Sequence, residues 1–441
     1  MSLAQAGYAQ QANWKAGAAK VRITPDKPLW MTGYGSRTHV STGTIHELYA
    51  RALALDDGTG KPAVLVTADI LGFTSEVSKR IADEVQKKYS IPRAKLILSA
   101  THTHGGPAIL QEHHMMYGVY ATPAELRDLE QYARDLENKI VELVGSALKQ
   151  MQPATLTLAH TQVAFAMNRR AKVATGYVIS PNEKGPADHD VPVLLVKSND
   201  GRILAVAFGY ACHNTTVGGD CYEFHGDWAG FAQSNLEKQH EGAVALFVQG
   251  CGADANPQPR GTMDLARQHG QTMGDAVEKT ISGSTKPIGG QLACAFRLVN
   301  LPFAPPPSRE ALQKQLEHKD IYFRWQAREL LKDLDRDGSL RAQYPCPIQA
   351  WKFGDDLTLI TIGGEVVVDY ALRLKKELAG REVWVAGYCN DVFAYVPSRR
   401  VLEEGGYEAG GAMVYYVQPG PFTSSVEETL VGEIQKMLAG R

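Results

Sequence analysis

The chain has 441 residues, of which 44% are hydrophobic and 21% charged, and its formal net charge is −2. This is the composition of a globular protein, long enough for one large domain or two to three ordinary ones. The small net charge, without a basic run interleaved with aromatic residues, gives no indication of nucleic acid as a partner. No stretch of about 18 apolar residues is present, so we expect no integral membrane segment.

The N-terminus is polar and rich in alanine, without the apolar core of a signal peptide. We interpret residues 1–16 as a flexible leader of the kind that remains after signal-peptide cleavage, and therefore predict a secreted or periplasmic protein. The six cysteines form no Cys-x-x-Cys pair, so their disulfide state stays open. Residues 17–441 contain no linker, low-complexity tract or internal repeat, and we expect them to form one large domain.

The first third of the chain alternates between strand and helix patterns. Residues 18–70 are typical of several short strands, and residues 75–88 of a helix. A short apolar run at residues 96–100 then predicts a buried strand. This order of strand, helix and strand is what a parallel crossover unit requires.

The alternation continues to the C-terminus. Thr122 and Glu125 have the spacing of a capping box and predict a helix over residues 122–150. A long loop is expected after Arg170. Further strands are predicted at 154–158, 191–196, 203–210, 244–248, 357–362 and 383–386, and further helices at 228–240, 262–281, 308–341, 366–378 and after Ser425. The pattern predicts an α/β fold with central mixed β-sheets flanked by helices.

The strand at 96–100 leads into two histidines and then a Gly-Gly-Pro turn. Side chains two apart on a strand point the same way, so His102 and His104 aim at one point if the extended conformation persists to Pro107. Catalytic groups gather on loops at strand ends, which a rigid sheet holds in place. Two surface histidines are an equally good reading of an isolated His-x-His, so the rest of the chain must supply partners.

Two further polar residues follow apolar strands. His213 comes after one such strand, and Glu365 follows another through a Gly-Gly pair. Alone, His213 is more often simply hydrogen-bonded, and Glu365 is more often a charge at a helix N-terminus. Together with His102 they form a possible His₂Glu set, the ligands of zinc hydrolases that keep an open position for water. His104 could then hydrogen-bond that water or the developing oxyanion.

These residues lie in stretches that resemble the neutral/alkaline non-lysosomal ceramidase family. Residues 99–107 are similar to the family signature Ser-Ala/Gly-Thr-His-Thr-His-Ser-Gly-Pro. Similar stretches follow one another in the same order along nearly the whole chain, at residues 45–53, 67–69, 167–169, 211–213, 363–365 and 390–407.

The resemblance implies a zinc-dependent amidase that cleaves the N-acyl amide bond of a sphingolipid or ceramide-like substrate. By motif match, the Zn²⁺ ligands are His102, His213, Glu365 and Tyr395. The residues implied to act on the amide and the tetrahedral intermediate are His104, Arg169 and Tyr407. Zinc-bound hydroxide would attack the carbonyl, zinc and Tyr407 would stabilise the oxyanion, and His104 would deliver a proton to the leaving nitrogen.

Several other residues in or beside the matched stretches are candidates for the site. Those expected to line the substrate are Asn168, Asn256, His225 and Asp227. The segment from His225 to Asp227 could alternatively bind a second ion. His46 and Asp69 are candidates for supporting the metal ligands from behind, although structural hydrogen bonding is the simpler role for each.

Two features depart from the family pattern. The family's ceramide-cleaving members carry a Gly-Asp-Val-Ser-Pro-Asn segment, and residues 252–257 place Asn256 at its serine. The family's enzymes also typically carry a C-terminal β-sandwich domain, for which we find no counterpart in residues 17–441. These departures favour, as an alternative, a non-catalytic metal-stabilised binding or cell-surface protein derived from the amidase fold.

A different metal-dependent hydrolase is the second alternative. Barrel amidohydrolases also use a His-x-His pair, but normally on the first strand, whereas at least three predicted strands precede His102. A serine hydrolase has little support, because the sequence contains no Gly-x-Ser-x-Gly nucleophile elbow.

Overall fold

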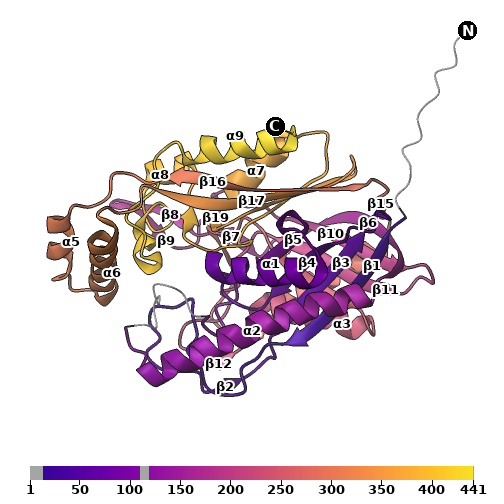
Figure 1. Cartoon of the computed structure of the whole chain (residues 1–441), viewed down its shortest axis with the longest axis horizontal. Coiled ribbons are helices and arrows are strands. Elements are labelled where there is room, and N and C mark those ends of the chain that lie inside the picture. Colours follow the sequence, from indigo (N-terminus) through magenta and orange to yellow (C-terminus); the bar gives the residue numbers. More distant parts are fainter. Residues whose placement is uncertain (1–12, 110–118, 441) are drawn as a thin grey trace, which may run out of the picture.

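The computed structural model describes residues 13–109 and 119–440. They form four layers, with helices outside a large sheet, a small sheet packed on that sheet, and helices outside the small sheet (Figure 1). The strands of the large sheet in this part of the chain are β1 (Lys15–Arg22), β3 (Tyr49–Asp56), β4 (Ala63–Ala68), β5 (Leu96–Ala100), β6 (Gln152–Gln162), β10 (Asp190–Ser198), β11 (Ile203–Tyr210), β13 (Val244–Gln249) and β15 (Lys286–Pro287).

The large sheet is mixed. Its strand order is β13-β11-β10-β6-β1-β3-β4-β5, with β15 paired to β6, and its parallel pairs are β4 with β5 and β11 with β13. Helix α1 (Ser75–Tyr89) connects β4 to β5, which confirms the predicted crossover unit. The small sheet has the order β16-β17-β18-β20, and its strands are β16 (Leu292–Pro302), β17 (Gln343–Phe353), β18 (Leu357–Ile362) and β20 (Val383–Ala386).

Strands β4 and β5 are apolar on both faces because both faces are covered. Leu65 and Ile97 point toward the small sheet and share a core with Trp351 of β17. Their neighbours Val64 and Leu98 point the opposite way, since successive strand residues alternate, and share a core with α1 and α2 (Pro123–Lys149). The predicted α/β class with central mixed sheets flanked by helices is therefore confirmed.

The remaining helices cover the other faces. Helices α3 (Asp227–Gln239) and α4 (Met263–Ile281) pack on the β10, β11 and β13 part of the large sheet. Helices α7 (Val368–Glu377) and α9 (Val426–Leu438) pack on the outer face of the small sheet (Figure 1). The shorter elements are β2 (Gly43–Thr44), η1 (Arg93–Lys95), β7 (Ala166–Asn168), β8 (Arg170–Val173), β9 (Gly176–Ile179), β12 (Glu223–Phe224), β14 (Ala255–Pro257), α5 (Arg309–Gln315), α6 (Ile321–Asp337), β19 (Glu365–Val366), β21 (Tyr395–Val396), α8 (Arg399–Glu404) and η2 (Gly411–Tyr416).

Three local predictions need correction. The single helix predicted at 308–341 is two helices, α5 and α6, because the Asp320 side chain accepts a hydrogen bond from the amide of Tyr322 and starts a new helix. The long loop expected after Arg170 contains the hairpin β8–β9. Helix α9 begins after Ser425 as predicted, but Ser425 makes no side-chain cap bond, whereas the capping box at Thr122 is present.

The N-terminal residues, the cysteines and the helix lengths answer three further predictions. Most of the predicted leader, residues 1–12, lies outside the described residues, and β1 already begins at Lys15. The Trp14 ring is buried, and its Nε1 atom donates to the carbonyl of Ile288 at 3.0 Å. All six cysteines fall in the described part of the chain and are free thiols. No helix in that part has the length and apolar character needed to cross a membrane.

The buried carboxyl of Asp391 predicts a pH-dependent stability. It accepts a hydrogen bond from the Tyr344 hydroxyl at 2.7 Å, and burial raises its pKa to about 8. Since the pKa of an unfolded aspartate is about 3.9, the stability that this group contributes is full below about pH 4 and is lost as the pH rises toward 8. We expect Asp391→Asn to remove this loss, because the amide stays neutral.

Urea unfolding of both proteins across this pH range measures the effect. The free energy of unfolding of Asp391→Asn, minus that of the parent, should increase with pH by on the order of a few kcal/mol. A difference that stays constant from about pH 4 to pH 8 would contradict a protonated Asp391 in the folded state.

Candidate metal centre

The candidate site lies where loops after strands of both sheets meet. His102 follows β5, His213 follows β11, and Glu365 follows β18 and opens β19. An isolated bridge between Thr103 and Asn214 aligns the two histidine loops in parallel. This bridge brings together histidines that lie more than a hundred positions apart in sequence.

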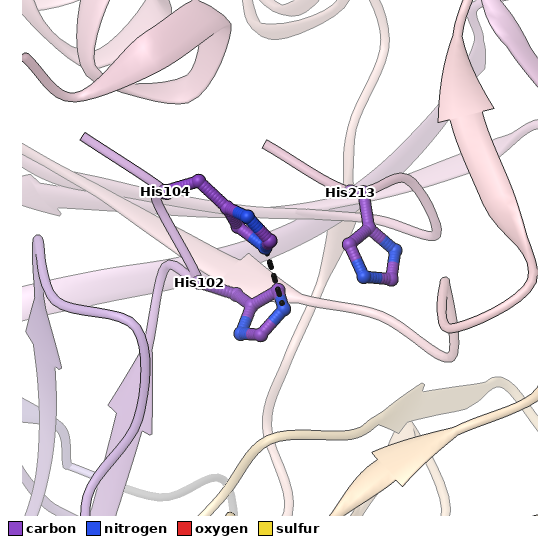
Figure 2. Close-up of side chains that lie close together, drawn as sticks. All are labelled: His102, His104 and His213. Carbon is purple, nitrogen blue, oxygen red and sulfur yellow. Dashed lines mark hydrogen bonds between the residues drawn. The ribbon is translucent and has the colours of Figure 1, made fainter. Parts of the chain in front are cut away.

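The two histidines of the His-x-His pair converge, but not for the predicted reason. Strand β5 ends at Ala100, and His102 has a φ of 59°, so the extended conformation does not persist to Pro107. The left-handed residue turns the chain at the strand end. Nevertheless the Nε2 atoms of His102 and His104 lie 3.3 Å apart (Figure 2).

The orientation of two imidazole rings is set by backbone carbonyls. The Nδ1 atom of His102 lies 2.6 Å from the carbonyl oxygen of Leu71, and the Nδ1 atom of His213 lies 2.7 Å from that of Gly252. A carbonyl only accepts, so each Nδ1 must carry the proton and each Nε2 of a neutral ring holds a lone pair. Metal-ligating histidines commonly show this arrangement.

A carboxylate oxygen closes the set. Oε2 of Glu365 lies 3.3 Å from Nε2 of His102 and 3.1 Å from Nε2 of His213. Ligand atoms about 2.0–2.2 Å from a tetrahedral zinc ion lie roughly 3.3–3.5 Å from one another, close to the distances observed here. Nitrogen atoms of His102, His213 and His104 also lie within 4.8 Å of one another. The donor set therefore fits a zinc ion.

Burial and neighbouring charges shift the pKa values of the candidate ligands. The side chains of His102, His213 and Glu365 are all buried. Burial, together with the charge of Arg169, lowers the pKa of His213 to about 4, so its ring is neutral at pH 7. Burial alone would raise the pKa of Glu365, but the two histidines outweigh it and hold that pKa well below its usual value. The Nε2 atoms of His102 and His213 and Oε2 of Glu365 thus face one point.

Glu365 is held on both sides. Gly364 precedes it with a φ of 84°, and a Cβ atom there would lie 2.6 Å from Cγ2 of Val396, so the turn requires glycine. Oε1 of Glu365 accepts a hydrogen bond from the hydroxyl of Tyr416. The hydroxyl of Tyr388 lies 3.4 Å from Oε2, the oxygen that faces the histidines. Glu365 lies in a short strand rather than at the helix N-terminus that we predicted, because α7 begins only at Val368.

Tyr395 and Arg169 lie next to this set. Strands β19 and β21 pair in parallel with Glu365 opposite Tyr395. The hydroxyl of Tyr395 accepts a hydrogen bond from Nη2 of Arg169 at 2.9 Å. Burial alone would lower the pKa of Arg169, but Tyr395 and the neighbouring carboxylates raise it well above its usual value. The structure thus places Tyr395 beside Glu365 with its hydroxyl on Arg169, and its role as a fourth metal ligand stays a prediction.

Arg169 is fixed by three side chains. Its Nε atom donates to Glu408 at 2.8 Å, and its Nη1 atom donates to Oδ1 of Asn256 at 3.2 Å. The ring centroid of Tyr407 lies 5.9 Å from the guanidinium carbon and 5.3 Å from the Tyr395 ring. Burial raises the pKa of Tyr407, so its phenol remains protonated at neutral pH. Asn256 therefore contacts the predicted catalytic arginine.

Three predicted substrate residues make structural hydrogen bonds. Asn168 bonds to Asp254 and to the amide of Arg170. The carboxylate of Asp227 accepts three backbone amides, two of them at Thr216 and Val217, which follow His213. Nδ1 of His225 accepts the amide of Asp227 at 3.2 Å. These bonds hold the loops around the site, and contact of the three residues with substrate stays a prediction.

The residues proposed to support the metal ligands from behind do not contact them. Both carboxylate oxygens of Asp69 are engaged, and its charge is paired with Arg51 at 3.1 Å. His46 hydrogen-bonds Ser234 at 2.8 Å. Their structural hydrogen bonds agree with the simpler of the two predicted roles, since backbone carbonyls take the Nδ1 protons of His102 and His213.

Sequence reasoning missed several members of the site. Glu408 directly follows Tyr407, and that adjacency could have marked it as a partner for Arg169. Tyr388 comes two residues after the end of β20, just as His102 comes two residues after the end of β5. Tyr416 had no comparable signal, because it lies in the short helix η2 between loops, and only the tertiary fold brings it to Glu365.

Fold and side chains together define a mixed α/β protein with a buried candidate metal centre. Residues 14–288 match the family model described as "Neutral/alkaline non-lysosomal ceramidase, N-terminal". The chain belongs to this family, which confirms the resemblance found in the sequence.

Individual relatives are distant in sequence. The chain is 26% identical over 267 residues to neutral ceramidase B of Dictyostelium discoideum, a match that covers 57% of this chain and 36% of that protein. It is 22% identical over 511 aligned residues to the neutral ceramidase of Pseudomonas aeruginosa, covering 100% of this chain and 74% of that protein. The chain thus spans little more than a third of the Dictyostelium relative.

Solved structures share the fold. The crystal structure of neutral ceramidase from Pseudomonas aeruginosa superposes with a TM-score of 0.74 at 19% identity, covering 96% of this chain and 73% of that chain. A structure described as ceramidase complexed with C2 gives a TM-score of 0.72 at 18% identity, covering 94% and 73%. At these identities the likeness establishes the fold.

Metal analysis of histidine variants tests the ligand set. His102→Ala removes one of the three converging lone pairs, and we expect zinc affinity to fall by more than about a hundredfold, since even outer partners of ligands contribute 10–100-fold. His104→Ala should retain about one zinc per chain, because the other three ligand atoms remain. Inductively coupled plasma mass spectrometry after dialysis measures both.

His160→Ala is the matched control, because His160 pairs with Asp190 near the surface. It should bind zinc like the parent. Loss of zinc from His104→Ala, with His102→Ala unaffected, would contradict the assignment.

Proposed function

We propose that this protein is a zinc-dependent amidohydrolase that cleaves the N-acyl amide bond of a ceramide-like lipid. The observation that carries the proposal is the convergence of three ligand atoms, since Oε2 of Glu365 lies 3.3 Å from Nε2 of His102 and 3.1 Å from Nε2 of His213. Zinc held by such a His₂Glu set lowers the pKa of water to about 7 and polarises a carbonyl oxygen.

His104 is suited to move the proton. Its Nε2 atom lies 3.3 Å from that of His102, so it borders the metal position. Burial and the neighbouring histidines lower its pKa well below the usual value, so the resting ring is neutral and can accept a proton from water. The same nitrogen can then return the proton to the leaving amine nitrogen.

Tyr407 and Arg169 are suited to stabilise negative charge. A protonated Tyr407 can donate a hydrogen bond to the oxyanion that forms at the amide carbon. Arg169 is locked by Glu408 and Asn256, so its positive charge stays in place without reorganisation. The hydroxyl oxygen of Tyr395 accepts from Nη2 of Arg169, which leaves the O–H of Tyr395 free to donate to the substrate.

Family membership supports a ceramide-like substrate. The relatives matched along this chain are named neutral ceramidases. Asn256, which by resemblance stands at the family's serine, bonds Arg169. Attack by metal-activated water proceeds without an acylated side chain.

The test is hydrolysis of a panel of N-acyl amides, from short acylated amino acids to ceramide, by protein loaded with one zinc per chain. We expect cleavage of at least one long-chain N-acyl sphingosine, loss of that activity after dialysis against a chelator, and recovery on adding zinc. His102→Ala should be inactive. His160→Ala, the same substitution outside the site, should keep the parent rate.

Two results would contradict the proposal. Full activity of the metal-free protein would exclude a metal-dependent reaction. Stoichiometric zinc without turnover of any panel member would favour the non-catalytic metal-stabilised binding protein instead.

A further inference from the structure

Arg37, a buried arginine that is not among the predicted catalytic residues, contacts the site. The side chain of Arg37 is 2% exposed. Its Nη1 atom donates to the carbonyl oxygens of Thr32 at 2.6 Å and His104 at 2.8 Å, and its Nη2 atom donates to that of Cys221 at 3.1 Å. Three chain segments that are distant in sequence are thus tied to one side chain.

The surroundings of Arg37 stabilise its buried charge poorly. No carboxylate lies within ion-pair distance of it in residues 13–109 and 119–440, and its Nε atom has no hydrogen-bond partner there. Buried charges are normally paired, because removing an ion from water is unfavourable. Arg51, Arg169 and Arg170, the other buried arginines in the described part of the chain, each bond a carboxylate. Arg37 instead donates to backbone carbonyl oxygens, one of which belongs to His104.

His104 needs such support because its ring has no anchor of its own. The rings of His102 and His213 are fixed by carbonyl oxygens at Nδ1. The Nδ1 atom of His104 is buried and has no hydrogen-bond partner among the residues that the structure describes. Packing must therefore set the position of this ring.

The turn that Arg37 holds supplies that packing. The Tyr34 ring lies edge-on to the His104 ring at 4.8 Å between centroids, and the Tyr34 hydroxyl donates to the carbonyl of Val217 at 2.7 Å. Gly33, with a φ of 96°, approaches so closely that a Cβ atom there would lie 2.5 Å from Cγ of His104. The guanidinium of Arg37 lies 5.1 Å from the Tyr34 ring centroid.

We propose that Arg37 is a positioning residue for His104. It clamps the backbone of His104 to the turn at residues 32–34, and the Gly33 backbone and Tyr34 ring then hold the imidazole against Nε2 of His102. Arg37 acts through His104 and does not touch the substrate. Its effect on rate rests on the proposed function, whereas its effect on the His104 ring does not.

The test compares Arg37→Lys and Arg37→Met with the parent and with Arg93→Met. Arg93 is the matched control, because its guanidinium also donates to a backbone carbonyl, that of Leu96 at 2.7 Å, at the opposite end of β5. Nitrogen-15 imidazole resonances report each histidine ring, with and without one zinc per chain. Zinc content, melting temperature, kcat and KM are measured on the same samples.

We expect the Arg37 variants to bind one zinc and to shift and broaden the His104 resonances, with those of His102 and His213 unchanged. For the parent's best amide substrate, kcat should fall at least about tenfold with little change in KM, since a displacement near 1 Å can reduce rates by about a hundredfold. Tyr34→Leu should act in the same direction and supports the test if Arg37→Met fails to fold. Arg93→Met should lower the melting temperature only.

Folded Arg37 variants with unmoved His104 resonances would overturn the proposal, as would equal perturbation of all three histidines with loss of zinc. If the parent cleaves no amide, the proposed function fails, and the resonances alone decide the role of Arg37.

Discussion

The structure depends on the close approach of two imidazole nitrogens and one carboxylate oxygen in a buried site. The carbonyl oxygens of Leu71 and Gly252 take the Nδ1 protons of His102 and His213, so both Nε2 lone pairs face the Glu365 carboxylate. When both rings are neutral, three acceptors lie at hydrogen-bond distance with no donor between them and repel one another in a buried site. A bound cation resolves this conflict, and the ligand types and spacings are those of zinc.

The fold makes this arrangement possible by ending strands of two sheets at one place. The large sheet supplies the histidines and the small sheet supplies the carboxylate, so the face-to-face packing of the sheets fixes the ligand distances. Bridges between Ser99 and Cys389 and between Gly250 and Ala386 join the two sheets beside the site. Around the ligands, Glu408 and Asn256 hold Arg169 in place.

The sequence predicted the fold class, most helices and the core of the site, because these follow from local patterns. Apolar runs that end in histidine or glutamate mark strand ends, and Thr122 marks a helix start. It missed strands β16 and β17, since the polar residues of the half-exposed β16 and the prolines of β17 interrupt the strand pattern. Contacts such as Tyr416 with Glu365 depend on tertiary packing and leave no local pattern.

The most direct test of the central claim is X-ray diffraction from crystals of the zinc-loaded protein at wavelengths on either side of the zinc absorption edge. The account predicts one strong anomalous peak, about 2.0–2.2 Å from Nε2 of His102, Nε2 of His213 and Oε2 of Glu365. A fully loaded crystal without a peak at this position, or with zinc bound only elsewhere, would contradict it.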